Sequence, residues 1–211
     1  MKIAVIGAGG TIGQRIVREA LGRGHEVTAV VRDPARYGEA NPQVAAVKAD
    51  ARDADGLAAA FAGQDVVVSS FGPSQDGDVQ DYLRVAEALI DAVGRTPGQR
   101  LLVVGGAGSL EVAPGLKLYD TPQFPEPWRP LAKAHGAGLE LYRASNIDWT
   151  FLSPAIMIEP GERTGAYRVG GEQVLFDAGG QSWISTEDYA VALLDEIERP
   201  QHIRQRFTVA Y

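Results

Sequence analysis

The chain has 211 residues, 45% of them hydrophobic, and its 20 Lys and Arg residues against 27 Asp and Glu residues give a net charge of −7. That length suits one domain with a large core. The acidic balance argues against binding to a nucleic-acid backbone, which normally needs a basic surface. Cysteine is absent, which excludes disulfides, thiol catalysis and iron–sulfur clusters.

The first residues show no cationic and apolar leader, because residues 2–6 have the pattern of a buried strand. No apolar run approaches the ~20 residues that span a bilayer. We therefore expect a cytoplasmic protein that works on a small molecule and binds neither membranes nor nucleic acids. The sequence is compatible with a homodimer.

In the first half of the chain, short β-branched runs alternate with helical patterns. Strands are expected at 2–6, 27–31, 44–47, 65–69 and 101–104, and helices at about 12–21, 54–61 and 79–93. Such alternation with short connections produces βαβ units and a parallel sheet covered on both faces. The sequence therefore predicts an α/β fold of the Rossmann type, a doubly wound parallel sheet.

The rhythm changes in the second half. Residues 105–130 contain five prolines and interleaved aromatic side chains, which predicts a long irregular segment. Next come a helix (131–145), a strand (149–152), a hairpin (166–169 and 173–176) around Gly170-Gly171, a helix (186–198) and a last strand (207–210). We expect a single domain, 1–211, with a Rossmann core at 1–154 and a small C-terminal substrate lobe with closing elements at 155–211.

The sharpest motif is Gly-Ala-Gly-Gly-Thr-Ile-Gly at residues 7–13, between the first strand and the first helix. Gly7 permits a tight turn, Gly10 lets the backbone approach a pyrophosphate, and Gly13 lets the helix pack closely. The helix N-terminus adds free N–H groups. No Gly-Lys-Ser/Thr follows, which argues against a nucleotide-hydrolase loop. The predicted dinucleotide contacts are Gly7, Gly9, Gly10, Thr11, Ile12 and Gly13.

The end of the second strand bears on the choice of cofactor. A basic residue there favours a 2′-phosphate, and an acidic one accepts the ribose hydroxyls. Arg32 comes first and predicts NADP(H), while Asp33 leaves NAD(H) open. Further cofactor contacts are expected beyond the other strands, from Asp50, Ala51, Ser70, Phe71, Gly72 and Gly105.

With these pieces placed, the chain resembles the atypical short-chain dehydrogenase/reductase superfamily. The matching stretches are 7–13, 25–32, 103–110, 148–154, 184–190 and 206–208. The similarity is greatest to the branch of NAD(P)H-binding proteins and NADH–flavin reductases, which is related to biliverdin/flavin reductases and to nitrogen-metabolite-repressor-like proteins. The resemblance implies a nicotinamide cofactor whose nicotinamide lies near Pro154, Ala155 and Ile156.

The chain departs from that superfamily at its usual Tyr-x-x-x-Lys motif. It has four lysines, and none has a tyrosine four residues before it. Aligning the helix by its exit puts His135 at the lysine position, where similar biliverdin/flavin reductases also carry a histidine. The usual serine falls near Gly106, with Ser109 slightly further on. His135 and Ser109 are therefore the candidate catalytic residues, against the alternative that both are structural.

The missing tyrosine bears on the substrate. Reduction of a simple carbonyl puts charge on one oxygen, so a positioned acid contributes strongly, whereas a flavin or quinone spreads the hydride's charge over its rings. We expect an NAD(P)H-dependent reductase that transfers a hydride to a flavin or quinone-like conjugated acceptor. A flavin would be its substrate and not a bound prosthetic group, and no metal is expected. Tyr119, Phe124 and Trp128 either stack the acceptor or form a small core. A non-catalytic NAD(P)-binding redox sensor and an isomerase or epimerase with a retained cofactor are the alternatives.

Overall fold

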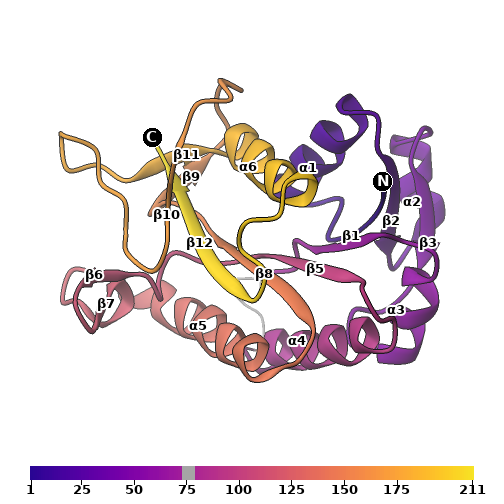
Figure 1. Ribbon diagram of the computed structural model, residues 1–211, viewed down its shortest axis with the longest axis horizontal. Coiled ribbons are helices and arrows are strands. Elements are labelled where there is room, and N and C mark those ends of the chain that lie inside the picture. The colour runs from indigo at the N-terminus through magenta and orange to yellow at the C-terminus, as the bar shows by residue number, and fades with distance from the viewer. Residues whose placement is uncertain (73–78) are drawn as a thin grey trace.

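The computed structural model describes residues 1–72 and 79–211 and places a large twisted sheet at the centre (Figure 1). Across the described residues its strand order is β10-β12-β8-β5-β4-β1-β2-β3, with β10 antiparallel and the rest parallel. The strands of this sheet are β1 (Lys2–Ile6), β2 (Glu26–Val31), β3 (Ala45–Lys48), β4 (Val66–Ser69), β5 (Arg100–Val104), β8 (Asp148–Ser153), β10 (Arg168–Gly170) and β12 (Gln205–Ala210).

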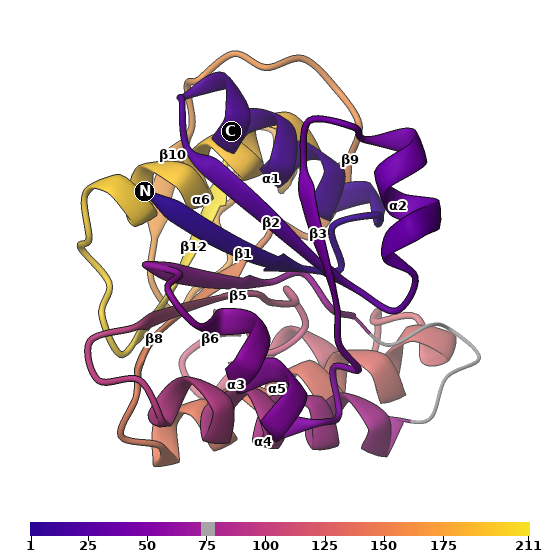
Figure 2. The same ribbon diagram turned by 90° about the vertical axis from the view of Figure 1, so that its right-hand side faces the viewer.

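Helices cover both faces of the sheet. One face carries α1 (Thr11–Gly22) and α6 (Thr186–Glu198), and the other carries α3 (Ala54–Phe61), α4 (Val79–Gly94) and α5 (Arg129–Ala144) (Figures 1 and 2). Two separate hydrophobic clusters fill the two spaces between sheet and helices. The predicted Rossmann-type α/β fold is confirmed.

A short helix at the β2–β3 edge was not predicted. It is α2 (Pro34–Ala40), and its signals were present in the sequence, because Asp33 accepts a hydrogen bond from the Arg36 backbone N–H at 3.1 Å and Pro34 occupies the first helical position. Aspartate as an N-cap followed by proline is a favourable helix start. The helix buries no residue, which explains why the apolar pattern did not reveal it.

The predicted hairpin is wrong. β10 pairs with β12, with Arg168 opposite Ala210, and not with residues 173–176. Gln173 instead forms an isolated bridge with Glu111. Gly170-Gly171 favoured a tight turn between two neighbouring strands. The open edge of β12, however, provides hydrogen-bond partners for the β10 backbone, and a partner so distant in sequence cannot be predicted from the local pattern.

Residues 105–130 are less irregular than expected. They contain β6 (Glu111–Ala113) paired with β7 (Leu116–Lys117), and two 3-10 turns, η1 (Leu118–Asp120) and η2 (Glu126–Trp128). In residues 155–211, β9 (Met157–Glu159) and β11 (Trp183–Ser185) form a small parallel sheet of their own, whereas α6, β10 and β12 belong to the main layers. A substrate-binding role for this part stays a prediction.

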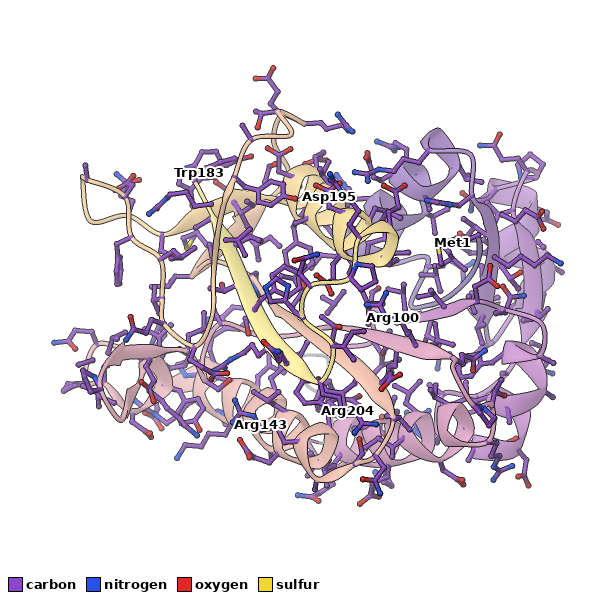
Figure 3. The ribbon with its side chains drawn as sticks, viewed as in Figure 1. Met1, Arg100, Arg143, Trp183, Asp195 and Arg204 are labelled. Atoms are coloured by element: carbon purple, nitrogen blue, oxygen red, sulfur yellow. The ribbon has the colours of Figure 1, made fainter. Side chains whose placement is uncertain are left out.

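The C-terminal end of the chain is tied to that small sheet. Trp183 is the first residue of β11 (Figure 3), and the Tyr211 ring packs edge-on against the Trp183 ring at a centroid distance of 4.5 Å. The Tyr211 hydroxyl donates to Asp188 at 2.6 Å, and Asp188 also accepts the backbone N–H groups of Thr164 and Gly165. Asp188 is fully buried. Its hydrogen bonds connect α6 to the loop at residues 164–165 and to the C-terminal residue Tyr211.

Two glycines inside α5 are required by side chains of other elements. A Cβ on Gly136 would lie 3.2 Å from the Tyr119 ring, and a Cβ on Gly138 would lie 2.6 Å from Cε1 of Tyr82. Glycine disfavours a helix interior, but these two glycines let Tyr119 and Tyr82 pack against the helix.

This packing predicts opposite effects for two Gly→Ala substitutions in helices. Gly138→Ala should lower the free energy of unfolding by ~1–2 kcal/mol, because overpacking against Tyr82 outweighs the better helix propensity of alanine. Gly38→Ala in α2 should raise it by ~0.5–1 kcal/mol, since a Cβ there meets no atom within 4 Å. Urea unfolding followed by circular dichroism measures both, and equal shifts would contradict the packing argument.

Candidate functional site

A cleft of about 760 Å³ opens beyond the carboxyl ends of β1, β2 and β4. From β1 the chain continues to β2 on one side, and β4 lies on the other side. That reversal of strand order is where open α/β sheets bind ligands. Among the residues lining the cleft are the predicted cofactor contacts Gly7, Gly9, Gly10, Arg32, Asp50, Ala51, Phe71 and Gly72.

The turn between β1 and α1 is held together by close backbone contacts. Gly7 has φ +74°, and its carbonyl accepts the Gly10 N–H at 3.0 Å. A Cβ on Gly13 would lie 2.0 Å from the same carbonyl oxygen, and a Cβ on Gly7 would lie 2.6 Å from the Ser70 carbonyl. The Ser70 hydroxyl also donates a hydrogen bond to the Gly7 carbonyl at 3.2 Å. Gly13 and Ser70 therefore pack against the turn on the side away from the cleft.

The start of α1 suits an anion. Gly10 provides no side-chain cap, and the first turn holds no acidic residue. The first backbone N–H groups of a helix need outside acceptors, and they favour negative charge. Thr11 and Ile12 contribute to this turn, although their side chains do not line the cleft. Gly9 and Gly10 line the cleft without side chains, and a Cβ on Gly9 would meet no protein atom within 4 Å, so the space in front of this turn suits a pyrophosphate.

Two arginines stand at the mouth of the cleft. Arg32 and Arg36 both line it and are exposed, and within residues 1–72 and 79–211 neither guanidinium has a hydrogen bond or ion pair. One oxygen of Asp33 is occupied as the cap of α2. The arrangement offers two free cations to a ligand that carries an extra negative group. Sequence reasoning missed Arg36, and recognition of the Asp33-Pro34 helix start would have placed it near Arg32.

The far wall of the cleft is an ion-pair bridge. Asp50 accepts from the Arg52 backbone and guanidinium, both at 3.0 Å, and Arg52 Nε donates to Asp81 on α4 at 2.6 Å. The Arg52 N–H keeps the pKa of the Asp50 carboxyl below its usual value, and Arg32 contributes in the same direction. Asp50 is therefore ionised and in place to accept a donor such as an adenine amino group. Arg52 and Asp81 were not predicted.

The other predicted cofactor contacts lie outside this cleft. Gly105 donates its N–H to the Leu152 carbonyl at 2.8 Å, and a Cβ there would overlap the Phe151 ring at 2.0 Å. Pro154 and Ala155 are buried at the end of β8, and Ile156 is 38% exposed. Their contact with a nicotinamide stays a prediction.

The two candidate catalytic residues have different surroundings. His135 on α5 packs beside Gly106, where a Cβ would lie 3.0 Å from its Cγ, just beyond β5. Burial lowers the pKa of His135 to about 4, so the imidazole is neutral near pH 7. Ser109 is 3% exposed and accepts a hydrogen bond from the buried Arg206 guanidinium at 2.8 Å. Ser109 thus has a structural partner, and catalytic roles for both residues stay predictions.

Within the described residues, no ring-to-ring contact joins the three aromatic candidates Tyr119, Phe124 and Trp128. Tyr119 packs on the glycines at 108 and 136, and Arg129 lies 5.7 Å from the centre of the Phe124 ring. Trp128 is 48% exposed. Arg129 also donates to the backbone carbonyls of Tyr119 and Phe124, which fixes the segment to the start of α5. Their role in acceptor binding stays a prediction.

In the described residues, no helix has the length and apolar character needed to cross a bilayer.

The β1–α1 turn predicts how two glycine substitutions affect binding of a nicotinamide dinucleotide. Gly13→Ala should weaken binding by about tenfold or more, equivalent to ~1.4 kcal/mol, because its Cβ would push Gly7 and open the turn. Gly22→Ala, at the other end of α1, should leave binding within about twofold, since a Cβ there meets no atom within 4 Å. Titration calorimetry measures both affinities, with circular dichroism as the check of folding.

Comparison with known proteins agrees with this site. A family model described as NAD(P)H-binding matches residues 7–200. The uncharacterized protein YwnB of Bacillus subtilis is 44% identical over 99% of this chain and 98% of its own length. An NAD(P)H azoreductase of Xenophilus azovorans is 29% identical over 98% of this chain and 67% of its own length.

Two solved structures have the same fold along the whole chain. A Burkholderia pseudomallei protein, named as a candidate exported protein, is 47% identical with a TM-score of 0.92, and the match covers 100% of both chains. A Streptococcus pneumoniae protein, named as a candidate NADH-flavin reductase, is 40% identical with a TM-score of 0.88, over 100% of this chain and 99% of that one. The resemblance seen in the sequence is confirmed, and this protein belongs to the NAD(P)H-binding family.

Proposed function

We propose that this protein is an NADPH-dependent reductase that transfers a hydride to conjugated acceptors, mainly flavins and quinones. The observation that carries the proposal is the neutral histidine that α5 holds and the absence of a Tyr-x-x-x-Lys motif. Beside Gly106, beyond β5, this helix presents the neutral imidazole of His135, and the chain contains no Tyr-x-x-x-Lys motif. A neutral imidazole is a weak proton donor, which suits an acceptor that needs little acid assistance.

The names of two relatives support an oxidoreductase of this kind. The Streptococcus pneumoniae protein is named for flavin reduction by NADH, and the Xenophilus azovorans protein for NAD(P)H-dependent azo reduction. Flavins and azo compounds share a conjugated system that spreads the negative charge arriving with a hydride. A cytoplasmic location belongs to the same proposal.

The reaction asks little chemistry of the protein itself. When bound, a reduced nicotinamide supplies the hydride, and the proton that balances it comes from solvent. The residues at 7–13 bind the pyrophosphate through backbone N–H groups, Asp50 orients the adenine, and Pro154 and Ile156 form the surface near the nicotinamide. Holding the two ring systems in contact then provides most of the acceleration.

The preference for NADPH rests on Arg32 and Arg36. Both guanidinium groups line the cleft and lack a hydrogen bond or ion pair within the described part of the chain. A 2′-phosphate carries extra negative charge and pairs well with guanidinium. One oxygen of the Asp33 carboxylate caps α2, which leaves only the other oxygen to accept a ribose hydroxyl.

Removal of these arginines should change selectivity between the two nucleotides. Arg32→Ala and Arg36→Ala should each weaken NADPH binding by about 5- to 150-fold, the range that corresponds to the loss of ~1–3 kcal/mol, and should leave NADH binding within about twofold. Arg199→Ala is the control, because Arg199 is 75% exposed at the end of α6 and lies outside the cleft. Equal loss for both nucleotides would contradict a 2′-phosphate contact.

Turnover is tested by mixing the protein with NADPH and FMN, FAD, a quinone or an azo dye, and by following the loss of absorbance at 340 nm. We expect oxidation with one or more of these acceptors, faster than with simple ketones. Tight NADPH binding without oxidation by any of them would favour a redox sensor. A co-purified cofactor that is not consumed would favour an isomerase or epimerase.

A further inference from the structure

Tyr82 on α4 and His135 on α5 form a contacting pair of rings that the proposed function does not yet use. The ring centroids are 4.5 Å apart with an angle of 51° between the planes. The imidazole also approaches the Gly106 backbone, where a Cβ would lie 3.0 Å from the Cγ of His135. The imidazole therefore packs against both a tyrosine ring and the loop that follows β5.

Each ring carries a buried polar atom without a partner. These atoms are Nδ1 of His135 and the hydroxyl oxygen of Tyr82. Buried polar groups are nearly always hydrogen-bonded, because an unpaired one loses its water without compensation. His135 Nε2 is not among the buried unpaired atoms and has no hydrogen bond within the described residues. The imidazole thus has one enclosed nitrogen without a partner and one accessible nitrogen.

The packing around the pair is costly for the helix that carries it. Gly138 must be a glycine because a Cβ would lie 2.6 Å from Tyr82 Cε1, although glycine disfavours a helix interior. Glycine at 106 likewise gives room to His135. Local features that weaken stability and gather around one polar pair are typical of functional positions.

We propose that Tyr82 is a positioning residue, whose hydroxyl donates to Nδ1 of His135 and so holds the imidazole in the tautomer with its proton on Nε2. Because neither atom has a partner in the present side-chain positions, this bond requires a torsional adjustment of the two contacting rings, after which both atoms would be paired. The accessible Nε2–H then serves as a neutral hydrogen-bond donor toward the acceptor or the nicotinamide. The use of that donor rests on the proposed function, whereas the hydrogen bond does not.

The electrostatics of the pair agree with this arrangement. Burial keeps the pKa of His135 low, at about 4, so Nδ1 is free to accept a hydrogen bond near neutral pH. Burial also raises the pKa of Tyr82 above its usual value, so its hydroxyl keeps its proton and can donate. An unpaired acceptor is also tolerated better in a protein interior than an unpaired N–H donor, which favours the same tautomer.

The test reads the tautomer of His135 directly by ¹⁵N NMR of the imidazole rings. The chain has three histidines, and a His135→Gln variant assigns the signals. In the wild type we expect one neutral tautomer with the proton on Nε2. In Tyr82→Phe the Nδ1 resonance should move downfield, because an accepted hydrogen bond shields an unprotonated ring nitrogen. A proton on Nδ1 in the wild type, or an unmoved Nδ1 resonance in the variant, would overturn the proposal.

Thermal unfolding provides a second measurement and a matched control. Tyr167 donates its hydroxyl to Asp195 at 2.5 Å, in a different part of the fold. Tyr167→Phe should lower Tm and leave the His135 resonances unchanged. Tyr82→Phe should also lower Tm if its hydroxyl is bonded, whereas an unchanged or raised Tm would show an unpaired hydroxyl and contradict the proposal.

These readouts separate the two proposals. Absence of turnover with every acceptor would end the proposed function and leave the NMR result to decide on the hydrogen bond. If turnover is present, loss of activity in Tyr82→Phe without a weaker NADPH affinity is the further expected result. Unchanged turnover in that variant would overturn the positioning role.

Discussion

The site depends on how closely the backbone of the β1–α1 turn packs on itself. The carbonyl of Gly7 accepts an N–H from Gly10 and a hydroxyl from Ser70, while Gly13 approaches it within the space that a Cβ would need. This contact aims the first turn of α1 at the cleft, and the backbone N–H groups of Thr11, Ile12 and Gly13 have no partner within the described residues. The order of β1, β2 and β4 then places the walls of the cleft around that point.

Charge divides the cleft into distinct regions. Arg52 is held by Asp50 and Asp81, so it stiffens the wall near α4. Arg32 and Arg36 have no such partners in the described part of the chain. A salt-bridged arginine loses part of its attraction for a ligand, whereas an unpaired one keeps it. Arginine therefore stabilises the cleft wall at position 52, whereas at positions 32 and 36 it offers a binding group to a ligand.

The glycines of α5 have a different role from those of the β1–α1 turn, because they leave space for side chains of other elements and not for a ligand. Those at 136 and 138 receive the rings of Tyr119 and Tyr82, and this brings His135 against the loop after β5. The helix thereby carries a neutral imidazole at the position where the resemblance to short-chain dehydrogenases predicts a lysine. In the proposed reductase, an acceptor bound there would meet a hydrogen-bonding group and no strong acid.

The fold class, the glycine turn and several of the residues that line the cleft follow from the sequence alone, because βαβ periodicity and Gly7 to Gly13 are local patterns. Partners distant in sequence were decided by tertiary structure. β10 pairs with β12 because that edge of the sheet was open. Ser109 accepts a hydrogen bond from Arg206. Arg36 lines the cleft because it lies on α2, a helix that buries no residue. Local pattern fixes backbone shape, whereas hydrogen bonds between distant segments depend on which groups the folded chain leaves unpaired.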